Sequence, residues 1–494
     1  MFRDNRWCIL AIVSSALFLI SVDMTVLYTA LPTLTHDLGA SAAEKLWIIN
    51  AYTLVVAGLL PGLGTLGDRA GHKKMLMSGL VMFGAASLAA ALAPSAGHLI
   101  MARIVLGLGA AMMMPATLSI IRLTFSDSGE RALALGIWGA LASGGAALGP
   151  VIGGLLLEYF QWGAVFLINI PVVLAALLSC GLILPPNAPN HEQPWSLSGS
   201  FLITVGLVGL TYAIKEISKA EPSTSAALAA LAAGVGGLAA FVHSQSRSLK
   251  PLIDFSLFRD RIFSNGVLVA LLVSLAMVGT ELAISQRLQL VLGLSPLQAG
   301  LAILPIPLAA FMGGPLAGLL LPRIGQKKLL AGALFLAGTG LIIVLFTRDI
   351  GGPIHSLGLA ALGFGVGGSM AAASTAIMSG ASAERAGMAA SIEEVSYELG
   401  GAMGVTIFGS LLAMVYSSTL TLPSELASLS QVYDSLDAAL LTSEHLAPES
   451  AGILVNLARQ SFDKGFITVL AVAAIMIAVM LAGLGLQKAQ TTGN

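Results

Sequence analysis

The sequence has few charged residues and few cysteines. Lysine, arginine, aspartate and glutamate make up 10% of the 494 residues, whereas a soluble globular protein carries about 25%. Cys8 and Cys180 both lie in apolar segments, which excludes a disulfide framework. The net charge of −1, without a basic stripe, excludes a nucleic-acid-binding protein. Because 56% of the residues are apolar, the composition indicates a membrane protein instead.

Motifs for nucleotide, metal or ATP chemistry are absent or out of context. Gly62-Leu-Gly64-Thr-Leu-Gly67 spells the dinucleotide fingerprint, but that motif has meaning only between a strand and a helix of a soluble unit. The sequence contains no Walker loop, no HExxH motif and no zinc-type cluster of cysteine and histidine. We therefore expect no enzymatic activity, no cofactor and no bound metal.

Long apolar stretches recur along the whole chain, and about 20 apolar residues suffice to cross a bilayer. They predict an all-α integral membrane protein with fourteen transmembrane helices. The stretches run roughly over residues 7–31, 46–66, 75–93, 99–121, 131–157, 162–184, 197–217, 225–243, 262–290, 298–321, 329–346, 355–379, 386–416 and 462–486. The first is too long for the core of a signal peptide and no clean cleavage site follows it.

A short basic turn occurs twice in the chain, once in each half. Gly64, Arg69, Gly71, Lys73 and Lys74 recur in register as Gly318, Arg323, Gly325, Lys327 and Lys328. Such a repeat predicts two similar six-helix bundles with a substrate cavity between them near the midplane. We expect the bundles at residues 1–185 and 260–494, two linker helices at 197–245, and a long polar outer loop at 417–461. The loops on the same side of the membrane as the N-terminus carry more basic residues than those on the other side, which predicts that both termini are cytoplasmic.

Five acids lie inside predicted spans: Asp23, Glu281, Glu393, Glu394 and Glu398. A charge at bilayer depth costs at least about 2.5–3.5 kcal/mol, so each is a candidate proton or cation site. Burial favours the neutral form of a carboxylic acid and an approaching cation favours the ionised form, so one carboxylate can exchange a proton for a cation. Glu394 and Glu398 share a helical face, while Glu393 points about 100° away.

Simpler roles for these acids stay open from the sequence. Asp23 could be satisfied by a neighbouring hydroxyl or by Arg103, a lone cation in the fourth span that needs a partner and could tune a first-span acid. Glu281 could pair with Arg287, six residues further on. The glutamates near residue 394 could simply face water in a cavity.

Several motifs together resemble the major facilitator superfamily. The turn Gly64-Thr-Leu-Gly-Asp68-Arg69-Ala-Gly71-His-Lys73-Lys74 resembles its signature loop. Further resemblances are the fourth-span stretch at Arg103, the fifth-span stretch Gly145-Ala-Ala-Leu-Gly149-Pro150-Val-Ile-Gly153-Gly154, and the segments around Asp23, Trp47, Asn169 and Glu393. The combination is typical of the fourteen-span drug:proton antiporter branch, and is most similar to exporters of quaternary ammonium compounds and methyl viologen of the QacA and SmvA type.

The resemblance implies a proton-coupled exporter of lipophilic organic cations that works by alternating access in a bacterial inner membrane. Its partners are then organic cations, protons and the lipid bilayer, and it functions as a monomer without nucleic acid. In such proteins the fifth-span residues seal and hinge the two halves: Gly145, Gly149, Pro150, Gly153 and Gly154. The first turn acts as a latch of the outward-open state: Asp68, Arg69, Lys73 and Lys74.

Aromatic residues could line the drug cavity, because cations bind over aromatic rings. The candidates are Tyr28, Tyr52, Trp138, Phe311 and Tyr397. Each could equally face lipid or the protein core. Two other functions compete with cation export: export of neutral or anionic compounds such as tetracycline-like drugs, and a membrane sensor or scaffold that transports nothing.

Overall fold

In the computed structural model, every regular element of the described residues is a helix. The structure describes residues 6–184, 197–217, 223–248, 251, 253–348, 352–380, 386–426 and 429–486. Within them, thirteen helical segments are long and apolar enough to cross a membrane. The 32-residue helix α5 lies between the fourth and fifth of these, and several of its side chains fall outside the described residues. The prediction of an all-α, multi-pass membrane protein is confirmed.

The helices of the N-terminal half are α1 (Arg6–Asp37), α2 (Ala42–Ala70), α3 (His72–Ala91), α4 (Ala96–Thr124), α5 (Ser128–Tyr159), α6 (Ala164–Leu167) and α7 (Asn169–Ile183). The linker helices are α8 (Leu197–Ile217) and α9 (Thr224–Arg247). The C-terminal half contains η1 (Phe255–Arg259), α10 (Arg261–Gln286), η2 (Arg287–Val291), α11 (Pro296–Ile303), α12 (Pro305–Ile324), α13 (Gln326–Thr347), α14 (Gly352–Ser379), α15 (Ala386–Thr419), η4 (Ser430–Tyr433), α16 (Leu436–Ser443) and α17 (Pro448–Leu486).

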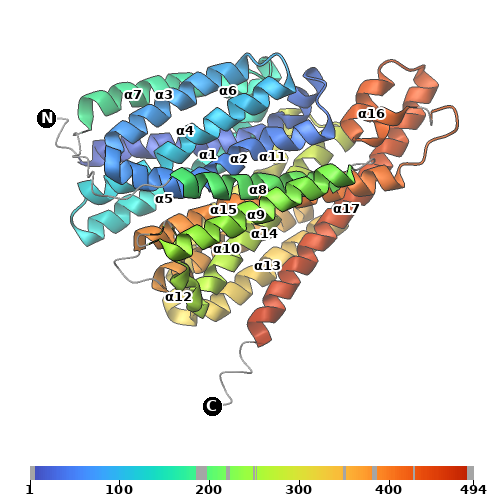
Figure 1. Cartoon of the computed structure of the whole chain (residues 1–494). Coiled ribbons are helices and arrows are strands. Elements are labelled where there is room, and N and C mark those ends of the chain that lie inside the picture. The colour runs from blue at the N-terminus through green and yellow to red at the C-terminus, as the bar shows by residue number, and fades with distance from the viewer. Residues whose placement is uncertain are drawn as a thin grey trace.

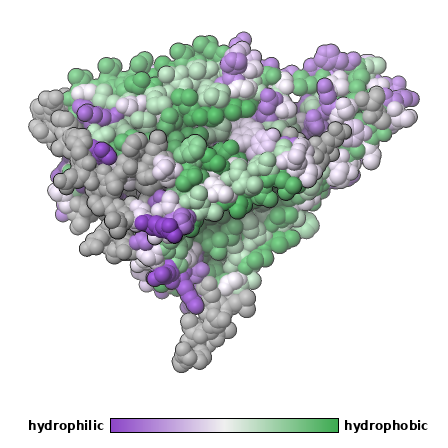
Figure 2. Space-filling view, in the orientation of Figure 1, coloured by the Kyte–Doolittle hydropathy of each residue, from purple (hydrophilic) through white to green (hydrophobic). Residues whose placement is uncertain are grey.

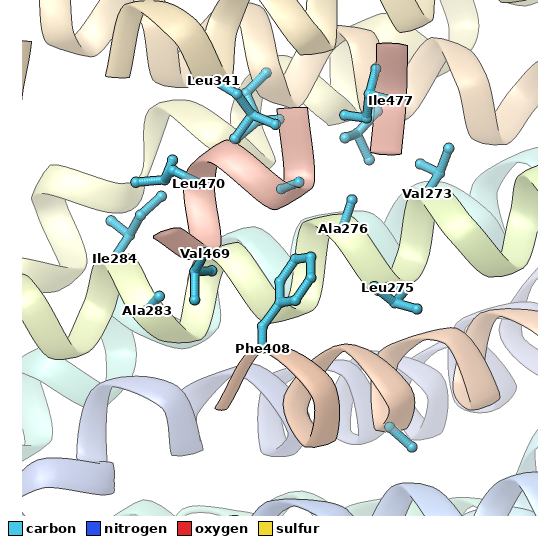
Figure 3. Close-up of a cluster of buried hydrophobic side chains, with 14 of the residues drawn as sticks. Val273, Leu275, Ala276, Ala283, Ile284, Leu341, Phe408, Val469, Leu470 and Ile477 are labelled. Carbon is cyan, nitrogen blue, oxygen red and sulfur yellow. The ribbon is translucent and has the colours of Figure 1, made fainter. Parts of the chain in front are cut away.

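Each half has its own hydrophobic core. In the N-terminal half α1 packs on α5, and α4 packs on α2 and α3. In the C-terminal half α14 packs on α12 and α13, and α10 packs on α14 and α15. Figure 3 shows part of the second core, where Phe408 of α15 and Val469 of α17 lie against α10. The two halves form the upper and lower parts of the molecule in Figure 1.

The repeated basic turn has the same backbone in both halves. Gly71 joins α2 to α3 with φ +99°, and Gly325 joins α12 to α13 with φ +78°. Side chains with a Cβ rarely adopt this region, so glycine is favoured at both turns. The sequence repeat therefore corresponds to a structural repeat.

Two of the predicted spans are interrupted. The sixth consists of α6 and α7, which meet at Ile168, and the tenth consists of α11 and α12, which meet at Leu304. In both cases proline follows the break closely, as Pro171 or as Pro305. A proline ring removes a backbone donor and clashes with the preceding turn, which explains the interruptions.

The polar loop before the last span is more helical than the sequence suggested. Its expected helical patch at residues 436–441 is confirmed as α16. However, the last helix begins at Pro448 rather than near Phe462 and runs for 39 residues. Proline is favoured in the first turn of a helix, and Arg459 ties the added segment to the C-terminal half by donating to the carbonyl oxygen of Leu290, 3.1 Å away.

The linker helices lie along the junction of the two halves. α8 and α9 pack against each other, and α8 also contacts α2 and α15. Figure 1 shows both helices in green between the upper and lower parts. The ammonium of Lys215 on α8 lies 4.3 Å from the ring centre of Trp47 on α2, which adds a cation–π contact to this packing.

The molecule has two distinct ends. The α16 end carries α16 and the junction of α1 with α2, and the terminal end carries Arg6 and Leu486. Figure 2 shows apolar residues over most of the visible face, with hydrophilic residues gathered toward the two ends. This distribution fits helices that cross a bilayer with their ends in water.

Candidate functional site

A buried ion pair occupies the middle of the N-terminal half. Asp23 of α1 is completely buried, and its Oδ2 accepts a hydrogen bond from Nη1 of Arg103 on α4 at 2.7 Å. Arg103 also donates from Nε to the carbonyl oxygen of Ile48 at 3.2 Å. Its guanidinium lies 4.4 Å from the ring centre of Tyr52. Removing one member of such a pair typically costs about 3–5 kcal/mol, because the other charge stays buried and uncompensated.

The other oxygen of Asp23 is held by an asparagine. Nδ2 of Asn169, the first residue of α7, donates to Oδ1 of Asp23 at 2.8 Å and to Oγ of Ser87 on α3 at 3.1 Å. Asn169 and Ser87 are both completely buried. Side chains of α1, α3, α4 and α7 thus join in one polar network inside an apolar bundle.

The four acids of the C-terminal half lie on α10 and α15. Glu281 and Glu398 are buried, whereas Glu393 and Glu394 are partly exposed. Glu393 accepts a hydrogen bond from the hydroxyl of Tyr397 at 3.0 Å. Oε2 of Glu398 is buried and accepts no hydrogen bond from any described residue. Arg287 does not pair with Glu281: it donates from Nε to Asp463 at 2.7 Å.

A cavity of about 270 Å³ lies between the two halves toward the terminal end. Its walls come from the last turns of α2 and α4, from the first turns of α15, and from Pro251 beyond α9. Glu394 lines it, as do Arg122, Thr65, Ser119 and Ser391. Of the five acids predicted from the sequence, Glu394 is the one that reaches this cavity.

The two halves are closed against each other at the α16 end. Nδ2 of Asn50 donates to Thr406 at 2.6 Å, Ser285 donates to the carbonyl oxygen of Tyr28 at 2.9 Å, and Gln289 donates to that of Thr29 at 3.1 Å. Lys45 of α2 forms a buried ion pair with Asp437 of α16. His36 contacts Glu444 at 3.1 Å on the surface. The cavity is therefore separated from the α16 end.

The fifth-span glycines serve two different contacts. Gly145, Gly149 and Gly153 face α1 within the same half: a Cβ at Gly145 would lie 2.9 Å from the carbonyl oxygen of Phe18, and one at Gly153 would lie 2.7 Å from Val26. Gly154 and Pro150 instead meet α11 of the other half, where a Cβ at Gly154 would overlap the backbone of Leu297. The approach between halves thus depends on Gly154 and Pro150, while the stripe of three glycines packs within the bundle.

The predicted latch residues lie together at the terminal end. Lys73 donates to the carbonyl oxygens of Gly181 and Leu184 at the end of α7, where the partial negative charge of a helix end favours a cation. Lys74 is exposed and Arg69 is partly exposed. The side chain of Asp68 lies outside the described residues.

None of the five predicted aromatic residues is among those that line the 270 Å³ cavity. Tyr28 and Tyr52 are buried, and the ring of Tyr52 is covered by Arg103. Trp138 donates from Nε1 to Thr117 at 3.2 Å. Tyr397 is bonded to Glu393, and Phe311 is 41% exposed on α12. Their role in binding a drug in another conformation stays a prediction.

Three contributors to the site escaped the sequence reasoning. Asn169 enters the sequence prediction only through a motif, although a lone amide inside an apolar span is itself a signal that a buried polar group needs a partner. Asn50 and Lys45 bond to residues more than 350 positions away. No local pattern could have indicated those two contacts.

Comparison with known proteins agrees with the motif resemblance. A sequence model of the Major Facilitator Superfamily matches residues 13–405. The methyl viologen resistance protein SmvA of Salmonella typhimurium is 39% identical over 495 residues, covering 99% of this chain and 100% of that protein. The multidrug efflux pump LfrA of Mycolicibacterium smegmatis is 35% identical, covering 97% of this chain and 96% of that protein.

A solved structure shares the fold along the whole chain. It is a bacterial homologue of the human lysosomal transporter Spinster in an inward-facing and unoccupied conformation, with a TM-score of 0.66. It covers 97% of both chains at 17% sequence identity. At that identity the similarity speaks for the arrangement of helices alone.

Proposed function

Because this chain belongs to the Major Facilitator Superfamily, we propose that it exports lipophilic organic cations, such as quaternary ammonium compounds and methyl viologen, in exchange for protons. Membership makes it a multi-pass membrane transporter and not an enzyme. The relatives named for methyl viologen resistance and multidrug efflux support a drug as the substrate. The observation that carries the proposal is Glu394 in the cavity between the halves.

The first step of the exchange, binding of the cation, takes place in the cavity. A cation that enters it meets Glu394 together with the hydroxyls of Thr65 and Ser391, against an apolar wall that includes Leu60 and Met388. The positive charge stabilises the ionised carboxylate, so a proton held by Glu394 leaves when the cation binds. Methionine adapts to different apolar shapes, which suits a site that accepts several drugs.

Asp23 takes a separate role in this proposal. Both of its oxygens are engaged, one by Arg103 and one by Asn169, and the carboxylate is completely buried. A drug therefore reaches Glu394 before it could reach Asp23. We assign to Asp23 the proton that resets the N-terminal half after release of the drug.

Alternating access is supported by the closed α16 end and by the position of the cavity near the terminal end. The terminal end lies in the cytoplasm, as the basic residues indicate. In this conformation the protein, embedded in a bacterial inner membrane, therefore takes up substrate from the cytoplasmic side. Release outside requires the contacts between α5 and α11 and the Lys45–Asp437 pair to separate. The drug can drive this change only if it binds the two conformations with different affinities. One chain holds both halves, so we propose a functional monomer.

Purified protein in liposomes tests the exchange. We expect a quaternary ammonium compound or methyl viologen to cause proton release from the parent protein, and Glu394→Gln to abolish both proton release and export. Glu449→Gln serves as the matched control, because Glu449 is an exposed acid at the start of α17. Export by Glu394→Gln at the parent's rate, still following the pH gradient, would refute the assignment of the coupling to Glu394.

One observation supports a second candidate, an exporter of anionic compounds. Arg122 lines the same cavity and could attract an anion. Arg103 is already paired with Asp23 and offers no counter-charge. Competition separates the two: a quaternary ammonium compound inhibits dye efflux in the first case, whereas a tetracycline-like anion inhibits it in the second.

A further inference from the structure

The amide of Asn169 lies where four helices of the N-terminal half meet. It follows Ile168, where α6 ends and α7 begins, so residue 169 is the first residue of α7. From there Nδ2 reaches Asp23 on α1 at 2.8 Å and Ser87 on α3 at 3.1 Å. A carboxylate can only accept hydrogen bonds, so the amide nitrogen must face it while Asp23 is ionised.

The carbonyl oxygen of the same amide is not used in this state. Oδ1 of Asn169 is buried and accepts no hydrogen bond from any described residue. A buried acceptor without a donor costs free energy and needs an explanation. An amide has a donor on one side and an acceptor on the other, and a half-turn about its last torsion exchanges the two.

Protonation of Asp23 creates the donor that this oxygen lacks. Oδ2 faces Arg103, so the proton binds at Oδ1, the oxygen that faces Asn169. After the half-turn, the new O–H of Asp23 donates to Oδ1 of Asn169. Arg103 keeps its bonds to Oδ2 and to the carbonyl oxygen of Ile48. The hydroxyl of Ser87, which accepts from Nδ2 in the ionised state, can donate to Oδ1 after the half-turn, because a hydroxyl is both donor and acceptor.

We propose that Asn169 is a positioning residue that holds Asp23 in both of its protonation states, as a donor to the carboxylate and as an acceptor from the carboxylic acid. This inference rests on the proposed proton-coupled export. It explains why an amide lies in a span that is otherwise apolar. A leucine would form no hydrogen bond with Asp23 in either protonation state, and a group that can only accept hydrogen bonds would bind only the protonated acid. Asn169 is completely buried and is not among the residues that line the 270 Å³ cavity, so it acts through Asp23.

The groups around Asp23 limit what else could respond to pH. Arg103 on α4 forms the ion pair with Asp23, and Tyr52 on α2 lies under the same guanidinium. The carboxyl group of Glu398 on α15 interacts electrostatically with the hydroxyl of Tyr52 across the junction of the halves. The carboxyl group of Glu281 on α10 interacts electrostatically with the hydroxyl of Tyr28 on α1. The described residues that α3, α5 and α7 bring to this region carry no charge: Ser87, the fifth-span glycines and Asn169.

The test compares pH profiles of cation export in liposomes with equal pH on both sides. Asn169→Leu keeps the approximate volume and removes donor and acceptor. A hydrogen bond to a charged group is worth more than one between neutral groups. Losing the bond from Asn169 therefore makes Asp23 bind its proton about tenfold more tightly, which corresponds to about one pH unit. We therefore expect half-maximal export by Asn169→Leu to move about one unit to higher pH.

Two controls separate positioning from a structural effect. Ser87→Ala removes the other hydrogen-bond partner of Asn169 and is expected to shift the profile much less. Combining Asn169→Leu with Asp23→Asn should give the same profile as Asp23→Asn alone, because the group that responds is gone. A parent-like profile of Asn169→Leu, or an equal shift by Ser87→Ala, overturns this inference. Absence of cation-evoked proton release by the parent overturns the proposed function itself.

Discussion

The ion pair between Lys45 and Asp437 makes a quantitative prediction about closure of the α16 end. Lys45 belongs to α2 and Asp437 to α16, so the pair joins the two halves. The side chains are 7% and 5% exposed. Both would be hydrated once the halves separate at this end. Replacing one partner therefore weakens the closed state more than the open state.

The expected size follows from the burial of both charges. Leaving one of two buried, paired charges without its partner costs about 3–5 kcal/mol. Since about 1.4 kcal/mol corresponds to a factor of ten in an equilibrium constant, Lys45→Met should shift the balance toward the open α16 end by about two to four orders of magnitude. Replacing both residues, as in Lys45→Met with Asp437→Leu, removes both desolvation costs and should restore most of the closed population.

Labelling of an introduced cysteine measures this balance. Thr29 is completely buried at the closed junction, and its carbonyl oxygen accepts from Gln289. We would place Thr29→Cys in a background with Cys8→Ser and Cys180→Ser, and follow its reaction with a membrane-impermeant maleimide added from outside. Fast labelling in Lys45→Met and slow labelling in the double variant are expected. Equal labelling rates in the parent, Lys45→Met and the double variant would refute the reasoning.

Other substitutions test further parts of the structure. Asp23→Asn should slow cation export over repeated turnovers in liposomes, because the proton that resets the N-terminal half is lost; an unchanged rate would remove Asp23 from the coupling. Gly154→Val inserts side-chain atoms where Leu297 already lies and should disfavour the closed α16 end by about 1–3 kcal/mol, seen as faster labelling of Thr29→Cys. Gly71→Ala should lower the free energy of unfolding by about 1–2 kcal/mol, because φ is +99° there. Gly318→Ala is the matched control and should not destabilise the protein, because an added Cβ would meet open space.

The spans and the repeat could be predicted because they depend on local composition. About 20 consecutive apolar residues are needed to cross a bilayer wherever they occur, and the glycine of a turn with positive φ keeps its place in both copies, as at Gly71 and Gly325. The pairing of Asp23 with Arg103 was one of the open alternatives, because a lone cation at membrane depth requires a partner. The structure shows that partner at 2.7 Å.

The remaining contacts depend on how distant segments meet. The sequence left Glu281 free to pair with Arg287, but Asp463 on α17 lies closer to that guanidinium once the helices pack. The early start of α17 escaped detection because residues 448–461 are too polar to span a membrane, although nothing in them prevents a helix. The polarity of a segment decides how far an apolar span extends, and helix propensity decides where the helix itself begins. At α17 the helix begins well before the apolar span.

The length of α17 has a mechanical consequence. A helix of 39 residues is about 58 Å long, while the hydrocarbon core is about 30 Å thick. The first part of α17, before the predicted span begins at residue 462, therefore extends beyond the lipid as a helical rod that packs against α16 and continues directly into the last span. An antibody fragment clamped to this rod would act as a lever on the last span, and would offer a handle for holding the transporter in one position during imaging or turnover.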